Sequence, residues 1–279
     1  MVKFYEKLNV RFQSTRSLLC IGLDPYSRYN LKKNYPKSKQ PYFDFCKDII
    51  DATAEFACAF KFQFAFFGSQ GVEEDLEHAI NYVQSKYSEI PIILDSKRGD
   101  IGSTATEYAK EAFIRYGADA LTINPYLGGD SIQVFTDYSD HGVIILCRTS
   151  NPGSAQIQEL RCGDRMLFEH VAYLAANQWN ENGNIALVMG ATHPKALSRV
   201  RKIVGDMLFL VPGIGAQGGN LRAALEHGLT EQGNGLIVNV SRDIVEAGMK
   251  ENQEFDLQAV HDAAQHYFDR MQMTTSNLI

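Results

Sequence analysis

The sequence predicts a closed (β/α)8 TIM barrel, an α/β fold of eight parallel strands each followed by a helix, with one leading N-terminal helix. Short apolar runs alternate along the chain with segments whose apolar residues recur at helical spacing. Eight such units fit into 279 residues, which favours a closed barrel over an open doubly wound sheet. Neither a shift in composition nor a linker divides the chain, so we expect one domain over residues 1–279.

The expected strands are mostly apolar runs at 18–25, 58–62, 91–97, 118–125, 142–147, 185–189, 207–211 and 235–240. Such runs are typical of parallel sheets that helices cover on both sides. In the second run, Ala59 and Lys61 share one face, whereas Phe60 and Phe62 share the other. A small and polar face opposite an aromatic face suits a strand between a barrel interior and a layer of helices.

Helices are expected at 3–17, 43–56, 71–86, 105–116, after Asp130, at 164–178, after Pro194, at 220–227 and at 256–271. The leading helix repeats an apolar residue every fourth position from Phe4 to Phe12. The lysine-rich segment 26–42 is predicted to be a long surface loop. Thr104 and Glu107 have the spacing of a capping box, which would explain Thr104 without any role for it in binding.

Composition excludes several classes of function. A net charge of −6 and a pI of about 5.7 argue against a nucleic-acid surface or an anionic membrane partner. The five cysteines are scattered, the start is charged where a signal peptide would be apolar, and no apolar run has a membrane-spanning length of about 18 residues. We therefore expect a cytoplasmic protein.

Two kinds of site are disfavoured by the motifs that the sequence lacks. The seven histidines form no H-x-H or H-E-x-x-H pair, so no metal site is predicted. There is no G-x-S-x-G elbow, and no cysteine lies beside an obvious base, which disfavours nucleophilic hydrolysis.

Polar residues follow every predicted strand. In barrels of this type, active sites lie at the C-terminal ends of the strands. The candidates at those ends are Asp24, Lys61, Asp95, Lys97, Asn124, Ser150, Thr192, Gln217, Ser241 and Arg242. A set spread over all strand ends is what a shared pocket would require.

The stretch from Asp95 to Ile101 concentrates charge of both signs at the end of a buried strand. If the strand persists, Asp95 and Lys97 point to the same face, where two charges are costly unless they are paired or used. A structural ion pair would explain a lone pair of this kind. The polar residues at the other strand ends favour a functional interpretation.

A glycine-rich loop follows the seventh predicted strand, with Gly213, Gly215 and Gly218 in a G-x-G-x-x-G pattern. As a dinucleotide fingerprint this is weak, because it does not lie in an opening βαβ unit. Backbone N–H groups before a helix can nevertheless bind an anion. With Ser241 and Arg242 after the eighth strand, the loop lies where barrels commonly bind phosphate.

These residues form an ordered set that resembles the orotidine 5′-phosphate decarboxylase family, in particular its longer bacterial branch. The motifs run from about residue 18 to 245 and comprise Leu23-Asp24-Pro25, Lys61, Asp95-x-Lys97-x-x-Asp100-Ile101, 124–130, 148–153 and 213–219. One departure is Phe62, where family members usually have proline after the lysine.

The resemblance implies cofactor-independent decarboxylation of orotidine 5′-phosphate to UMP, the last step of de novo pyrimidine synthesis. It implies a charge array of Lys61, Asp95, Lys97 and Asp100, with Lys97 protonating the carbanion at C6. Asp100 would act across a homodimer with shared active sites, and Lys61 would also contact the ribose. The implied substrate-binding residues are Asp24 at the ribose, Ile101 and Thr104 from the partner, Ser150 at the pyrimidine, Gln217 between pyrimidine and phosphate, and Ser241 and Arg242 at the phosphate.

Two alternatives stay open. A metal-dependent sugar-phosphate decarboxylase could use the same barrel, and a non-catalytic barrel could bind a phosphorylated ligand. The D-x-K-x-x-D motif alone would fit the first of these as well.

Overall fold

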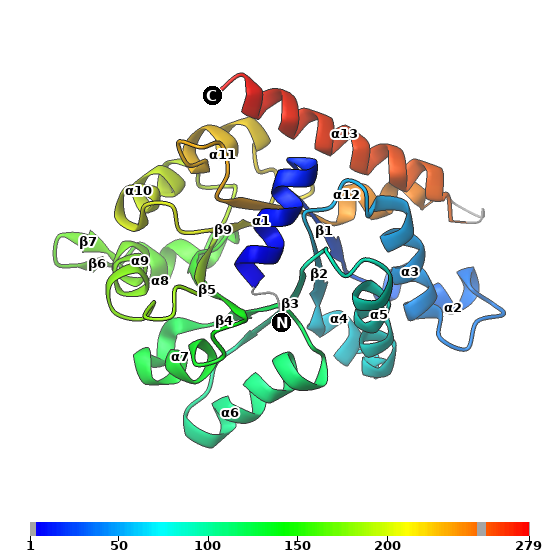
Figure 1. The fold of residues 1–279 in the computed structure, drawn as a ribbon, viewed down its shortest axis with the longest axis horizontal. Helices are drawn as coiled ribbons and strands as arrows, with labels where there is room; N and C mark the ends of the chain where they lie inside the picture. Colours follow the sequence, from blue (N-terminus) through cyan, green and yellow to red (C-terminus); the bar gives the residue numbers. More distant parts are fainter. Residues whose placement is uncertain (1–3, 250–254, 279) are drawn as a thin grey trace.

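The computed structural model describes residues 4–249 and 255–278 and contains a closed barrel of eight parallel strands (Figure 1). The strands are β1 (Leu19–Leu23), β2 (Ala59–Gln63), β3 (Ile92–Arg98), β4 (Ala120–Ile123), β5 (Gly142–Arg148), β8 (Ile185–Met189), β9 (Phe209–Val211) and β10 (Leu236–Val240). The pairing of β1 with both β2 and β10 closes the sheet. The predicted barrel is therefore confirmed.

Helices surround the barrel and follow its strands. The longer ones are α3 (Pro41–Thr53), α5 (Glu73–Lys86), α6 (Gly102–Lys110), α7 (Gly129–Thr136), α9 (Leu167–Asn177), α10 (Pro194–Val204), α11 (Leu221–Gly228) and α13 (Leu257–Ser276). The short α4 (Phe64–Gly68) follows β2 directly, and α12 (Arg242–Val245) follows β10 after one residue, Ser241. Among the described helices, none has both the length and the apolar character needed to cross a lipid bilayer.

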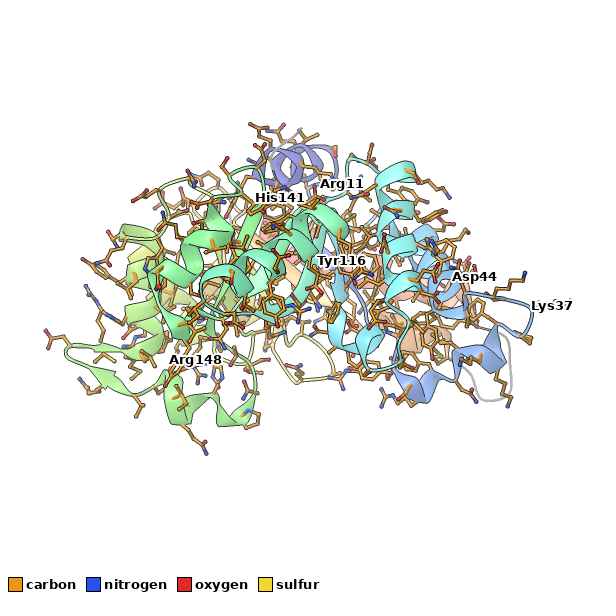
Figure 2. All side chains as sticks on the ribbon, turned by 90° about the horizontal axis from the view of Figure 1, so that it is seen from below. Arg11, Lys37, Asp44, Tyr116, His141 and Arg148 are labelled. Carbon is orange, nitrogen blue, oxygen red and sulfur yellow. The ribbon has the colours of Figure 1, made fainter. Side chains whose placement is uncertain are left out.

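The predicted leading helix is confirmed as α1 (Phe4–Thr15), although residue 3 lies outside the described residues. It covers the N-terminal end of the barrel. Phe4 and Leu8 join the core cluster inside the barrel. Gly142 permits this, because a Cβ there would lie 2.4 Å from the ring of Phe4. Figure 2 shows α1 and Arg11 at one end of the barrel and Arg148 toward the other.

The side chains of β2 alternate as predicted. Phe60 and Phe62 are buried in the layer between strands and helices, whereas Ala59 faces the barrel interior. Phe62, where the family usually has proline, is fully buried and pairs in register with Leu23 and Leu94. The strand thus continues through this position, and Lys61 points toward the C-terminal cavity described below.

The prediction that residues 26–42 form a long surface loop is wrong. It contains a 3-10 turn (Ser27–Tyr29) and the short helix α2 (Leu31–Asn34), and α3 already begins at Pro41. Tyr29 and Leu31 are buried, and the ring of Tyr29 lies 5.9 Å from that of Phe45. The many lysines of the segment favoured the prediction of a loop, although its two buried residues, Tyr29 and Leu31, anchor it to the core.

The predicted capping box at Thr104 is also wrong. The helix α6 begins two residues earlier, at Gly102, and its N-cap residue, Ile101, makes no side-chain capping bond. Glu107 instead pairs with Lys110 at 2.8 Å. The predicted helix 105–116 ends in a π-helical turn (Glu111–Arg115).

The connection after β5 contains regular secondary structure. It comprises a 3-10 turn (Pro152–Ser154), α8 (Ala155–Gln158) and a hairpin of β6 (Arg161–Cys162) and β7 (Arg165–Met166) at the periphery of the fold (Figure 1). This hairpin occupies the first residues of the predicted helix 164–178, which begins at Leu167 instead.

Candidate active site

A cavity of about 510 Å³ lies at the C-terminal ends of the barrel strands. Eight predicted site residues line it: Asp24, Lys61, Asp95, Lys97, Ser150, Gln217, Ser241 and Arg242. They come from β2 and β3 and from the segments that follow β1, β5, β9 and β10. The structure thus brings together residues that lie more than 200 positions apart in the chain.

Three charged groups form the floor of this cavity. Lys97 Nζ lies 2.6 Å from Asp95 Oδ1, and Lys61 Nζ lies 3.3 Å from Asp95 Oδ2. Lys61 and Asp95 are buried, whereas 44% of the Lys97 side chain is exposed, toward the cavity that it lines. One carboxylate therefore holds two ammonium groups, one fixed in the protein and one accessible to a ligand.

The protonation states of the buried pair follow from this arrangement. Burial alone would raise the pKa of Asp95, but Lys61 and Lys97 lower it to about 2. Burial alone would lower the pKa of Lys61, but Asp95 and Asp24 raise it above its ordinary value. Both groups are therefore ionised at neutral pH, and Asp95 presents a fixed negative charge beside the cavity.

The backbone at Lys97 departs from an extended strand. Lys97 has a φ of +50°, a left-handed conformation that side chains other than glycine rarely adopt. The pairing of β3 with β4 shifts register between Leu94 and Arg98 at the same place. The strand β3 still includes both residues, and Asp95 and Lys97 line the same cavity as expected, although the strand pairing is irregular at this point.

Two residues that the sequence did not single out complete the surroundings of Asp95. The Thr122 hydroxyl donates to Asp95 Oδ1 at 2.7 Å, and Gln63 Nε2 donates to Oδ2 at 3.3 Å. Both line the cavity. Gln63 lies two residues after Lys61, so the two-residue alternation of β2 gives it the same face as Lys61, and the same reasoning applied to β4 would have found Thr122.

The wall formed by β1 and β10 carries Asp24. The hydroxyl of Ser241 donates to Asp24 Oδ2 at 2.6 Å, and Lys61 Nζ lies 4.0 Å from Asp24 Oδ1. Gly22 makes room for this contact, because a Cβ there would lie 2.7 Å from the Cβ of Ser241. Asp24 Oδ1 is buried and accepts no hydrogen bond from the described residues, which leaves it an acceptor for a ligand hydroxyl.

The loops after β5 and β9 meet over the cavity. Ser150 Oγ donates to Gln217 Oε1 at 2.6 Å. In the second loop, Gly213, Gly215 and Gly218 have φ values of +99°, +77° and +78°, and the loop leads into α11. These glycines let the backbone turn tightly before a helix, and Gly213 and Arg242 line the same cavity, where a turn of this kind and a guanidinium group suit an anion.

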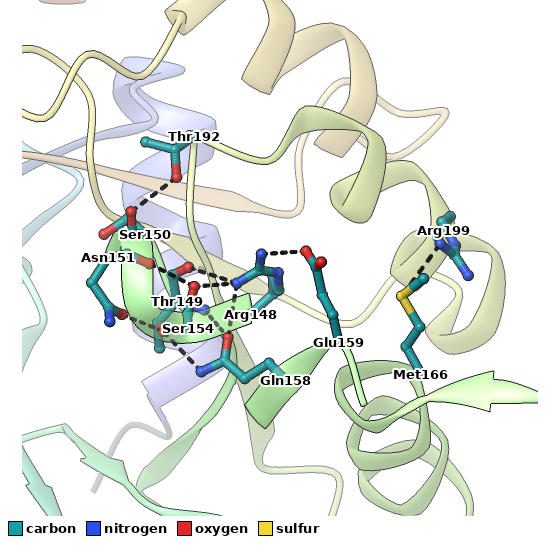
Figure 3. A network of polar contacts seen from close by, with 10 residues as sticks. All are labelled: Arg148, Thr149, Ser150, Asn151, Ser154, Gln158, Glu159, Met166, Thr192 and Arg199. Carbon is teal, nitrogen blue, oxygen red and sulfur yellow. Dashed lines mark hydrogen bonds and ion pairs between the residues drawn. The ribbon is translucent and has the colours of Figure 1, made fainter. Parts of the chain in front are cut away.

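A buried arginine organises the loop that carries Ser150 (Figure 3). Arg148, 1% exposed at the end of β5, donates to Ser154 Oγ, to Gln158 Oε1 at 3.1 Å and to Glu159 Oε1 at 2.6 Å. Gln158 Oε1 in turn accepts from the Thr149 N–H at 2.9 Å. One side chain thus ties together both ends of the segment 149–159.

Five predicted residues lie outside the cavity of the single chain. Asn124 accepts from the Tyr126 N–H, and Thr192 donates to the Ser150 carbonyl. Asp100 Oδ1 accepts from the Ile101 N–H at 2.8 Å, and Ile101 and Thr104 are exposed. The roles of Asp100, Ile101 and Thr104 require a second subunit and so remain predictions.

No group of three or more His, Cys, Asp or Glu side chains within residues 4–249 and 255–278 is arranged to hold a metal ion. In the cavity, both oxygens of Asp95 are already engaged by ammonium groups. Lys61 and Lys97 are the positive groups on the floor of the cavity.

Comparisons with known proteins agree with this arrangement. Residues 17–255 match the family described as Orotidine 5′-phosphate decarboxylase / HUMPS. The chain is 51% identical over 244 residues to the orotidine 5′-phosphate decarboxylase of Janthinobacterium sp. (strain Marseille), which covers 88% of this chain and 90% of the relative. It is similar to the solved OMP decarboxylase of Leishmania donovani, with a TM-score of 0.84, 40% identity, and coverage of 98% and 99% of the two chains.

The solved UMP synthase of Leishmania donovani is also similar, with a TM-score of 0.86 and 42% identity. The match covers 99% of this chain but 57% of that longer one. The matched residues contain every charged group of the cavity floor. The chain belongs to the orotidine 5′-phosphate decarboxylase / HUMPS family.

Proposed function

We propose that this chain is a carbon–carbon lyase that decarboxylates orotidine 5′-phosphate to UMP, the last step of de novo pyrimidine synthesis. The observation that carries the proposal is the Lys61–Asp95–Lys97 array on the floor of a cavity of nucleotide size. The names of the relatives at about half identity support the same substrate.

The reaction breaks the bond between C6 of the pyrimidine and its carboxylate carbon. CO2 leaves, the electron pair stays on C6, and the Lys97 ammonium delivers a proton to it; solvent then reprotonates the lysine. The carbanion has no adjacent electron sink, so fixed charges of the protein have to stabilise it. Lys97, held by Asp95 and accessible from the cavity, is the cation in position to do this.

Asp95 promotes the same step by destabilising the bound substrate. Its pKa of about 2 keeps it ionised, so it faces the substrate carboxylate as a like charge and disfavours the bound ground state. Lys61 keeps this carboxylate paired while Lys97 engages the reacting carbon.

One charge contact is too weak to account for catalysis alone. At an effective dielectric constant near 20, a contact at about 4 Å contributes about 4 kcal/mol. A rate enhancement near the top of the usual range needs about 23 kcal/mol. Binding energy from the distant phosphate has to contribute, and closure of the loops after β5 and β9 would deliver it.

The remaining cavity residues fit the other parts of the nucleotide. Asp24 Oδ1 is an open acceptor for a ribose hydroxyl, beside Lys61. Ser150 faces the pyrimidine and Gln217 lies between pyrimidine and phosphate. Ser241 and Arg242 bind the phosphate together with the glycine-rich loop.

We further propose a homodimer in which Asp100, Ile101 and Thr104 of the partner subunit complete each site. Exposed apolar residues gather near this segment: Ile101 is 60% exposed, Tyr126 84% and Leu127 46%. A second copy covering them would bring Asp100 toward Lys97 of its neighbour.

The reaction as proposed needs no cofactor, and the chain would act in the cytoplasm. A metal-dependent sugar-phosphate decarboxylase is the alternative that a simple experiment separates. UMP formation from orotidine 5′-phosphate should continue in excess EDTA, whereas loss of activity on chelation would contradict the proposal. Tight binding of UMP without any turnover would indicate the non-catalytic barrel instead.

A further inference from the structure

We propose that Thr122 is a positioning residue for decarboxylation, whose single hydroxyl fixes both the backbone of Lys97 and the carboxylate of Asp95. The inference rests on the proposed function, because its consequence is a change in turnover. Thr122 lies on β4, is 1% exposed and belongs to the apolar run Ala120–Ile123.

The hydroxyl makes two hydrogen bonds whose directions are determined by chemistry. An ionised carboxylate only accepts, so the Thr122 proton must point to Asp95 Oδ1, 2.7 Å away. The Lys97 N–H donates to Thr122 Oγ1 at 3.0 Å and therefore uses an oxygen lone pair. The hydroxyl therefore donates one hydrogen bond and accepts another, and both partners belong to the charge array.

These bonds coincide with the irregularity in β3. The register between β3 and β4 shifts between Leu94 and Arg98, and the Lys97 N–H donates to a side chain of β4. Lys97 itself has the left-handed φ of +50°. An unusual backbone conformation persists only where its surroundings hold it. The Thr122 hydroxyl contacts Lys97 itself, and the Asn124 N–H donates to the carbonyl of the next residue, Arg98, at 2.8 Å.

A closed ring of contacts results. Asp95 Oδ1 accepts from both Thr122 Oγ1 and Lys97 Nζ, while the N–H of the same lysine returns to Thr122. The lysine is thereby held at its backbone and at its side-chain end. Without the hydroxyl, the Lys97 N–H loses its acceptor, Asp95 loses a donor, and the ammonium group is free to shift.

Displacement of a catalytic group by about 1 Å can cost on the order of a hundredfold in rate. Asp24, Gln217, Ser241 and Arg242, which are proposed to hold ribose and phosphate, lie in the segments that follow β1, β9 and β10. The Thr122 hydroxyl bonds to Asp95 and Lys97 instead. The change should therefore appear in kcat, with much less effect on the binding of UMP.

The test compares Thr122→Val, which keeps the shape but removes the hydroxyl, with Thr122→Ser, which keeps the hydroxyl. We expect kcat of Thr122→Val to fall by about 10- to 100-fold with UMP affinity within about threefold of wild type, and Thr122→Ser to stay within about threefold in both. Thr53→Val is the matched control, because Thr53 is equally buried and donates to a helix carbonyl, Ile49 O, at 2.7 Å.

Equal kcat values for Thr122→Val and Thr122→Ser would overturn the inference. A fall in kcat of the same size in Thr53→Val would do so too, since it would show a general cost of removing a buried hydroxyl. If Thr122→Val does not fold, Thr122→Ala against Thr122→Ser makes the same comparison. A wild-type chain that forms no UMP would contradict the proposed function instead, so the two failures are distinguishable.

Discussion

Asp95 Oδ1 lies 2.6 Å from Lys97 Nζ, although Lys97 adopts a left-handed backbone conformation where the pairing of β3 with β4 is irregular. Such conformations cost on the order of 1–3 kcal/mol. The backbone of the site is therefore locally strained where a partly exposed ammonium group contacts a buried carboxylate.

The Asp95 carboxylate should make stability depend on acid pH. Its pKa is depressed to about 2 in the folded chain, so its contribution is fully present above the unfolded value of about 4 and is lost as pH falls through about 2. Urea unfolding between pH 5 and 2 should show a wild-type loss of about 2 kcal/mol that Asp95→Asn lacks. Asp137→Asn, an exposed position, is the control and should behave like wild type. Parallel curves for wild type and Asp95→Asn would contradict the assignment.

Arg148 should support substrate binding through the loop that it holds. Arg148→Met leaves Ser154 and Gln158 without their charged donor, so we expect the free energy of unfolding to fall by about 1–3 kcal/mol and KM to rise. Arg148→Lys should rescue little, because an ammonium group cannot reproduce the several directed bonds of the guanidinium.

The control for this change is Arg199→Met, an arginine of which half the side chain is exposed and which pairs with Glu169. Chemical denaturation and steady-state kinetics provide both measurements. An unchanged KM in a destabilised Arg148→Met variant would show that the network is structural only.

Asp100 should act in the site of the neighbouring subunit. Lys97→Ala and Asp100→Ala chains should each be nearly inactive alone, and mixing them should restore activity, because each hybrid dimer contains one site with neither substitution. The measurement is UMP formation after co-refolding, with hybrid formation shown by differently tagged chains. Hybrids without any recovery of activity would contradict the shared site.

The barrel could be predicted from the sequence because its strands and helices differ in apolar periodicity, and the barrel topology places strand ends together. Asp24, Lys61, Asp95 and Lys97 were predictable for this reason: a charged residue at the end of a buried strand is conspicuous. Thr122 was not, because one hydroxyl within an apolar run resembles an ordinary strand residue. Its role depends on the backbone irregularity at Lys97, which arises only when β3 and β4 pair.

Other features were hidden for similar reasons. Leu31 precedes two lysines, so the local composition predicted that this segment is exposed to solvent. Tertiary packing buries Leu31 instead. Arg148 was recognised only as part of a motif, whereas its burial follows from the turn and helix that fold over it. The position of Asp100 relative to Lys97 of a neighbouring subunit depends on the geometry of a dimer. Reasoning about a single chain does not give that geometry.

The most direct test of the account is the turnover of Lys97→Ala. We expect kcat to fall by several orders of magnitude, because the variant lacks both the cation beside C6 and the proton that C6 requires. UMP should still bind, since Ser241, Arg242 and the glycine-rich loop are unchanged. Lys110→Ala, at an exposed lysine paired with Glu107, is the control and should keep wild-type turnover. Near-normal decarboxylation by Lys97→Ala would contradict the account.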